Sequence, residues 1–180
     1  LMELSSKQIE QFNKDGYIIF PELFTSDEIE IFKNEVDRVS KIRSEMVVRE
    51  GEDEAVKIMF QLHEENVETA SPPFRTAARS PRILRTAQQC LGDEELYLHH
   101  SKLNMKSAIE GSAWPWHQDF HSWHLDGIKQ PDMVTVTVVL TEASPINGCM
   151  YVLPGSHKQG RSSPRWDDST AYKLWVAKTP

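Results

Sequence analysis

The sequence predicts an α+β fold, mainly β in its second half, or a β-sandwich that helices buttress. Two observations lead to this prediction. In the first half, apolar residues recur every three or four positions behind helix-capping residues. From Leu96 onward, short apolar runs typical of strands alternate with turn residues. The length of 180 residues fits one domain with one buried core, which we expect to span residues 1–180.

Two helices are predicted near the N-terminus. Ser5 and Ser6 cap a short one that ends at Asp15-Gly16, and residues 25–27 cap a longer one. Between them, residues 17–20 form a short apolar run of strand type that Pro21 closes. The longer helix buries one face, formed by Ile29, Phe32, Val36, Val39 and Ile42.

The middle of the chain shows both strand-like and helical patterns. Residues 50–54 read as an acidic turn, and residues 55–63 alternate like a strand. Pro72-Pro73 is expected to stop whatever precedes it. A further helix is expected from about Pro81 to Gly92, where glycine suits the C-terminal cap.

Four strands are predicted in the second half. They cover residues 97–105, 114–117, 134–140 and 149–153. Residues 145–148, with the sequence Pro-Ile-Asn-Gly, form the turn between the last two.

Composition and charge exclude several classes of protein. Hydrophobic residues make up 39% and charged residues 26%, which is typical of a globular domain. The net charge of -7 disfavours nucleic acid or an anionic membrane as partner. No apolar run approaches the roughly 20 residues that cross a bilayer, and no signal peptide is visible. Cys90 and Cys149 are isolated, so we expect reduced thiols in a cytoplasmic protein.

The densest polar and aromatic cluster covers residues 114–124, and its sharpest feature is His117-x-Asp119. On a strand, residues i and i+2 point to the same face, so an imidazole and a carboxylate can converge on one metal ion. This donor set suits Fe(II), with one further His completing a facial triad. An isolated H-x-D motif occurs often by chance, so the motif needs support from its context.

Residues 94–160 resemble the phytanoyl-CoA dioxygenase family of iron oxygenases, in particular its ectoine-hydroxylase-like branch. The motifs that carry this resemblance, in order along the chain, are Leu98-His99-His100-Ser101-Lys102-Leu103-Asn104, the run from Trp116 to His124, Leu140-Thr141-Glu142, Asn147-Gly148 and Leu153-Pro154-Gly155-Ser156-His157-Lys158. The N-terminal helices and residues 49–63 also look like that branch, so the likeness spans nearly all of the chain.

The resemblance implies a double-stranded β-helix, or jelly roll, with N-terminal buttressing helices. It also implies Fe(II) as cofactor, 2-oxoglutarate and O2 as cosubstrates, and His117 and Asp119 as catalytic iron ligands. Asn104 matches a position that helps to hold 2-oxoglutarate, and Thr135 matches a hydroxyl-bearing residue that contacts it. Trp123 matches an aromatic residue of the substrate pocket.

Two positions depart from the pattern of that branch. His100 and Lys102 stand where ectoine hydroxylases place Gln and Arg, near substrate and cosubstrate respectively. These departures put ectoine itself in doubt while leaving the iron chemistry intact. The family's second iron-binding His and its 2-oxoglutarate-binding Arg lie on later strands. We therefore expect the domain to be incomplete at its C-terminus, with both residues beyond Pro180.

The remaining histidines and tryptophans have simpler interpretations. His157 lies in a turn where it is structural or lines the cavity. His121 is also two residues from Asp119 and is the alternative to His117 as ligand, but the match to the family favours His117. Trp114 and Trp116 are interpreted as packing residues.

The function implied is hydroxylation of an unactivated C–H bond in a small polar substrate, such as an amino acid or its derivative. Succinate and CO2 form from 2-oxoglutarate, and the protein acts as a monomer or homodimer. Alternatives are a lipid, carrier-bound or natural-product substrate, or a cupin-like binding protein without turnover. A halogenase of the same fold is disfavoured, because such enzymes lack the metal carboxylate that Asp119 supplies.

Overall fold

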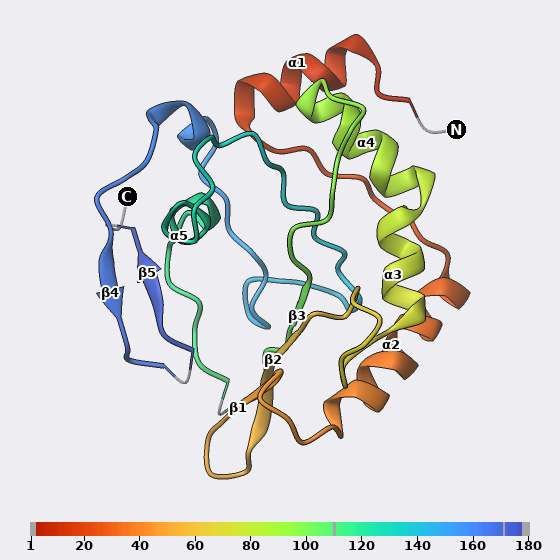
Figure 1. Cartoon of the computed structure of the whole chain (residues 1–180), viewed down its shortest axis with the longest axis vertical. Coiled ribbons are helices and arrows are strands. Elements are labelled where there is room, and N and C mark those ends of the chain that lie inside the picture. The colour runs from red at the N-terminus through yellow and green to blue at the C-terminus, as the bar shows by residue number, and fades with distance from the viewer. Residues whose placement is uncertain (1–2, 110, 171, 178–180) are drawn as a thin grey trace.

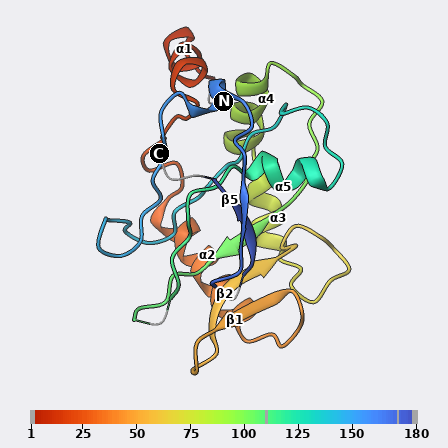
Figure 2. The same cartoon turned by 90° about the vertical axis from the view of Figure 1, so that its left-hand side faces the viewer.

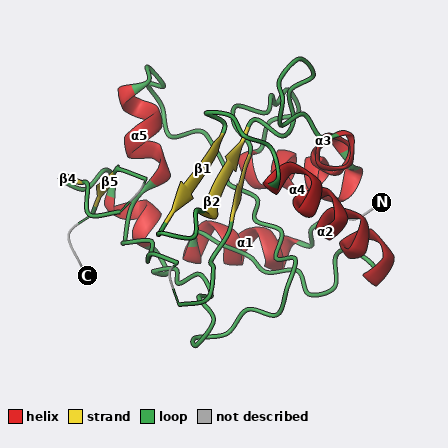
Figure 3. Cartoon of the chain, turned by 90° about the horizontal axis from the view of Figure 1, so that it is seen from below, coloured by secondary structure: helices red, strands yellow, loops and turns green. Residues whose placement is uncertain are grey.

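Two flanks of the molecule enclose a small central sheet (Figures 1 and 3). This computed structural model describes residues 3–109, 111–170 and 172–177, so the expected domain limits at 1 and 180 lie outside the described residues. One flank consists of four N-terminal helices, which are α1 (Ser6–Asp15), α2 (Ser26–Ser40), α3 (Pro72–Arg79) and α4 (Pro81–Leu91). The other flank, which faces the viewer in Figure 2, consists of α5 (Asp119–Leu125) and the hairpin of β4 (Arg165–Asp167) and β5 (Leu174–Val176).

The N-terminal helices begin where the sequence predicts, but α2 ends at Ser40, so Ile42, predicted on its buried face, lies beyond the helix. Ser5 and Thr25 each form a capping box with the residue three positions later, and Gly92 ends α4 in the left-handed conformation, with φ of 66°. Helix α3 was not predicted. Ser71 caps it and Pro72 occupies its first turn, where the missing N–H costs nothing. The proline pair therefore starts a helix as well as stopping the preceding segment.

The central sheet has the order β1-β2-β3 and is antiparallel throughout. Its strands are β1 (Val47–Glu50), β2 (Ala55–Phe60) and β3 (Lys102–Asn104), and the predicted acidic turn joins the first two. Met59 pairs with Val47 on one side and Leu103 on the other, and it is fully buried. The core lies between this sheet and α2, where Val36 and Val39 pack against Met59.

The predicted strands of the second half are largely absent as paired strands. Residues 97–105 pair only at Lys102–Asn104, and residues 114–117, 134–140 and 149–153 are without assigned strand structure within the described part of the chain. The same correction applies to residues 17–20, and β2 ends at Phe60 rather than at residue 63. Apolar alternation depends on sequence alone, whereas a strand requires a neighbouring strand for its hydrogen bonds. The turn at 145–148 is confirmed.

The mixed helical and β composition confirms the coarse α+β prediction, while the jelly roll is not visible in the two small sheets. The described helices include none long and apolar enough to cross a membrane.

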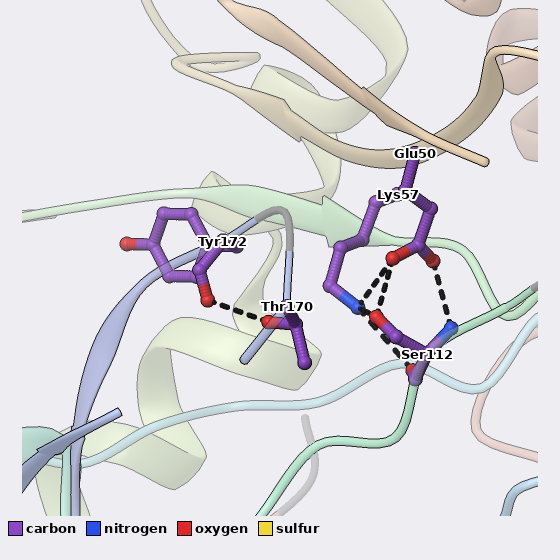
Figure 4. A network of polar contacts seen from close by, with 5 residues as sticks. All are labelled: Glu50, Lys57, Ser112, Thr170 and Tyr172. Atoms are coloured by element: carbon purple, nitrogen blue, oxygen red, sulfur yellow. Dashed lines mark hydrogen bonds and ion pairs between the residues drawn. The ribbon is translucent and has the colours of Figure 1, made fainter. Parts of the chain in front are cut away.

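A buried ionic cluster fastens the sheet to the segment that precedes α5 (Figure 4). Lys57 is 1% exposed, and its ammonium donates to Glu50 Oε2 at 3.1 Å and to the Ser112 carbonyl at 3.2 Å. The Ser112 amide donates to Glu50 Oε1 at 3.0 Å. Burial by itself raises the pKa of Glu50, but the hydrogen bonds from Ser112 and Lys57 outweigh it, so the net shift is downward.

We predict that Glu50→Gln lowers the free energy of unfolding by about 3 kcal/mol, because it leaves the Lys57 ammonium buried without its counter-charge. Denaturant unfolding of the full-length protein measures this change.

Glu54→Gln is the matched control, since Glu54 pairs with Arg43 at 2.5 Å but both side chains are exposed. We expect a loss below about 1 kcal/mol there. Equal losses in the two variants would show that the buried cluster has no special role.

Candidate metal centre

His117 and Asp119 lie side by side in a cavity on the flank that carries α5. The distance from His117 Nε2 to Asp119 Oδ1 is 3.3 Å. On the other side of the ring, His117 Nδ1 lies 2.8 Å from the Pro115 carbonyl oxygen. A carbonyl only accepts, so Nδ1 carries a hydrogen, and in the protonated ring Nε2 directs its own hydrogen toward Asp119. When the ring loses a proton from Nε2, Nδ1 keeps its hydrogen, and this is the tautomer that a metal-binding imidazole needs.

The convergence of the pair was predicted correctly, but its backbone was not. Residues 111–118 run without regular structure, and Asp119 is the first residue of α5, with Gln118 as the N-cap. The helix also removes His121 as an alternate ligand. Residues two apart on a helix point to nearly opposite sides, and the His121 ring packs instead on Trp175, at 5.5 Å between centroids.

Asp119 is held by groups on both of its oxygens. Thr135 Oγ1 donates to Asp119 Oδ2 at 3.0 Å, while Oδ1 faces His117. The hydrogen bond from His117 lowers the pKa of Asp119 to about 2, assisted by the Lys102 charge and opposed by burial. The same bond raises the pKa of His117, again against burial. Below the pKa of His117 the two groups therefore form an ion pair, and a metal would replace the hydrogen on Nε2.

The cavity around the pair has a volume of about 130 Å³. Its walls come from β3 and the residues just before that strand, from residues 114–126, and from the β4–β5 hairpin. The lining residues are His100, Lys102, Trp114, His117, Asp119, Ser122, Trp123, Asp126, Trp166, Tyr172, Lys173, Leu174 and Trp175.

Three of the predicted cosubstrate and substrate residues share this cavity with the pair. Lys102, His100 and Trp123 line it, and the His100 ring lies 4.9 Å from that of Trp123. Burial lowers the pKa of His100, and the charge of Lys102 lowers it further. Thr135 contacts Asp119 directly. Asn104 is exposed on β3 and is not among the lining residues.

Sequence reasoning missed the wall that the hairpin supplies. Trp166, Tyr172 and Trp175 come from a stretch for which no element was predicted, although three aromatic residues within ten positions are a signal for packing. Trp114, interpreted as a packing residue, also contacts two ammonium groups. Its ring lies 4.9 Å from the Lys57 ammonium and 5.3 Å from that of Lys102, so it links the buried cluster to the cavity.

His157 and the two cysteines lie outside the cavity. His157 Nε2 is 3.1 Å from the Asn13 carbonyl at the end of α1, which confirms its structural interpretation. Cys90 and Cys149 are free and half-buried. Within the described residues, no group of three or more His, Cys, Asp or Glu side chains is arranged to hold a metal ion. His117 and Asp119 therefore supply only two donors.

A larger groove of about 370 Å³ lies on the helical flank. Its lining is mostly apolar and includes Phe24, Phe32, Pro72 and Pro73. The groove contains neither member of the His117–Asp119 pair, so we assign the chemistry to the smaller cavity.

The profile of the phytanoyl-CoA dioxygenase (PhyH) family matches residues 12–176. The chain belongs to this family. It is 33% identical over 161 residues to the ectoine dioxygenase of Bordetella bronchiseptica, which covers 87% of this chain and 50% of that relative. It is 32% identical over 151 residues to the L-proline trans-4-hydroxylase of Streptomyces griseoviridis, which covers 83% and 54% respectively. The chain thus spans about half the length of these curated relatives.

The crystal structure of EctD from S. alaskensis with bound Fe superposes with a TM-score of 0.59 at 30% identity. The superposition covers 67% of this chain and 42% of EctD. A second EctD structure, with 2-oxoglutarate and 5-hydroxyectoine, gives a TM-score of 0.58 at 28% identity. The phytanoyl-CoA dioxygenase family and its ectoine-hydroxylase-like branch, both named from the motifs, are therefore confirmed.

The electrostatics of the pair lead to a prediction for the metal-free protein. Since the folded-state pKa of His117 lies above 6.5, the ion pair adds stability below pH 6.5 and loses it as the pH rises through that pKa. For Asp119 the added stability is lost as the pH falls through about 2. An NMR titration of the His117 ring should give a midpoint above pH 6.5, and affinity for a divalent metal should fall below it.

Asp119→Asn tests the assigned cause. Without the carboxylate, burial becomes the larger influence on the pKa of His117 and lowers it. The His117 midpoint should therefore move to lower pH. A midpoint that stays in place in this variant would rule out Asp119 as the source of the shift.

Proposed function

We propose that the full-length protein is an Fe(II)- and 2-oxoglutarate-dependent dioxygenase. It hydroxylates an unactivated C–H bond of a small polar substrate, such as an amino acid or its derivative, and converts 2-oxoglutarate to succinate and CO2. The observation that carries this proposal is the His117–Asp119 pair, with Nε2 and a carboxylate oxygen 3.3 Å apart in a cavity. Membership of the phytanoyl-CoA dioxygenase family and the names of its relatives support it.

The donors fit iron. Two ligands at adjacent positions of a metal with bond lengths near 2.1 Å lie roughly 3 Å apart, close to the separation in the pair. Imidazole plus carboxylate is two-thirds of the facial triad of non-haem Fe(II) oxygenases. The third ligand is then another His, which we place outside the described residues. Bound iron, with 2-oxoglutarate and O2, supplies the oxidising chemistry, as cofactors generally do.

The protein's own groups would position the cosubstrate and the substrate. Lys102 places an ammonium in the cavity, where it can pair with a carboxylate of 2-oxoglutarate. Thr135 fixes Asp119 through its hydroxyl and lies close enough to the pair to contact the cosubstrate too. Asn104 stays a proposed cosubstrate residue on the strand of Lys102. Trp123 and His100 would contact substrate, and the small cavity favours a ligand of amino-acid size.

For the fold, we propose that residues 1–180 belong to one jelly-roll oxygenase domain. Residues 134–140 and 149–153 run without assigned strand structure and expose large apolar side chains, among them Val139, Met150 and Tyr151. Such segments are suited to pairing with further strands. We also propose a cytoplasmic monomer or homodimer that binds neither nucleic acid nor membrane, which its acidic charge and free cysteines favour.

His117→Ala tests the function. The variant should lose at least about 100-fold in Fe(II) affinity and in succinate formation, because one of the few metal donors is removed. Metal analysis and a 2-oxoglutarate turnover assay on the full-length protein measure both.

His157→Ala is the matched control, since it removes an exposed imidazole that contacts the end of α1. It should keep metal and turnover. Full iron occupancy and activity in His117→Ala would contradict the proposal, as would native protein that binds no Fe(II).

A further inference from the structure

The β4–β5 hairpin is tied at both ends to the residues that flank His117. Gln118 Nε2 donates to the Gly160 carbonyl at 3.0 Å, and the Ser162 amide donates to Gln118 Oε1 at 2.8 Å. After β5, the Ala177 amide donates to the Trp116 carbonyl at 2.7 Å. The segment carrying the metal pair therefore also fixes the place of the hairpin, and hairpin side chains have a defined position at the cavity.

Buried side chains hold the hairpin against the molecule. Val176 is 1% exposed and Leu174 is 8% exposed. Thr170 Oγ1 donates to the Tyr172 carbonyl at 2.9 Å, which shapes the turn between the strands (Figure 4). The Tyr172 ring then lies 5.6 Å from that of Trp114 and faces the cavity with Trp175. This wall offers aromatic surface to the methylene groups or the cationic nitrogen of a ligand.

Two opposite charges stand at the mouth of the same cavity. Asp126 follows the end of α5, and Lys173 lies on the hairpin beside Tyr172. Both are exposed, as expected for residues at a rim. In the ranges 111–170 and 172–177 neither side chain makes an ion pair or a hydrogen bond, although both line one cavity. Asp126 lines the same cavity as Tyr172 and Trp175, and its charge adds to burial in raising the pKa of Tyr172.

The other charged groups of the cavity lie with the metal pair. Asp119 would bind iron, and Lys102 would pair with 2-oxoglutarate in the function proposed above. Among the described residues that line the cavity, Asp126 and Lys173 are then the two charges left for the substrate. One is negative and one is positive, so together they complement a ligand that carries both signs.

We propose that Asp126 and Lys173 are the specificity-determining residues of this site, and that they select a small zwitterion over ligands carrying only one of its charges. Asp126 pairs with the cationic nitrogen beside Tyr172 and Trp175, and Lys173 pairs with the carboxylate. This inference rests on the proposed function for its chemistry, but ligand binding tests it separately.

Three probes of one ring size test the selection, namely L-proline, pyrrolidine with the cation alone, and cyclopentanecarboxylate with the anion alone. They are titrated into the full-length protein with Fe(II) and 2-oxoglutarate without oxygen, and again without metal, and tryptophan fluorescence is followed. Native protein should bind L-proline at least roughly five-fold more tightly than either analogue.

Each variant should lose the preference for L-proline over a different analogue. Asp126→Asn should lose the preference for L-proline over cyclopentanecarboxylate, and Lys173→Gln should lose the preference over pyrrolidine. The matched controls are Asp168→Asn and Lys158→Gln, which remove exposed charges outside the cavity and should bind like the native protein.

Native protein without a preference for L-proline would overturn the inference, as would variants that lose affinity for all three probes equally. Iron binding and 2-oxoglutarate decarboxylation, measured on the same samples, report the proposed function. If iron binding and decarboxylation fail but the preference for L-proline remains, the proposed oxygenase activity is refuted and the zwitterion site stands. If both succeed without that preference, the oxygenase activity stands and the zwitterion site is refuted.

Discussion

The orientation of the His117 ring is the constraint on which the rest of the site depends. The Pro115 carbonyl fixes one ring nitrogen, and the other nitrogen faces Asp119. This requires an irregular run up to Gln118 followed at once by α5, which starts at Asp119. The same run carries the contacts that hold the hairpin, through Trp116 and Gln118. One short segment therefore positions both proposed metal donors and one wall of their cavity.

Buried charge holds that segment against the rest of the molecule. Glu50 and Lys57 come from paired strands, and they contact Ser112, five residues before His117. Lys57 also lies under the Trp114 ring, whose neighbour across the cavity is Tyr172. Replacing such a cluster by apolar residues often changes the free energy of unfolding little, whereas removing one charged member lowers it strongly. Its effect here is positional, because it connects the rigid sheet to the otherwise irregular approach to the metal pair.

Local features were predictable from the sequence and non-local ones were not. The caps at Ser5, Thr25 and Gly92 depend on a few adjacent residues, and the structure has them where predicted. Pairing of the later apolar runs depends on distant strands, so periodicity alone overstated the sheets. In the site, the His117–Asp119 convergence was predictable from spacing, whereas α5, which turns His121 away, was not. The hairpin wall requires contacts across more than forty residues, as between Gln118 and Gly160.

Anomalous diffraction at the iron edge shows whether His117 and Asp119 bind iron. The crystal would contain the full-length protein, grown with Fe(II) and 2-oxoglutarate in the absence of oxygen. We expect one strong anomalous peak, about 2.1 Å from His117 Nε2 and at a similar distance from an oxygen of Asp119. A peak at other residues would contradict it. So would the absence of a peak with the two side chains still in contact at 3.3 Å.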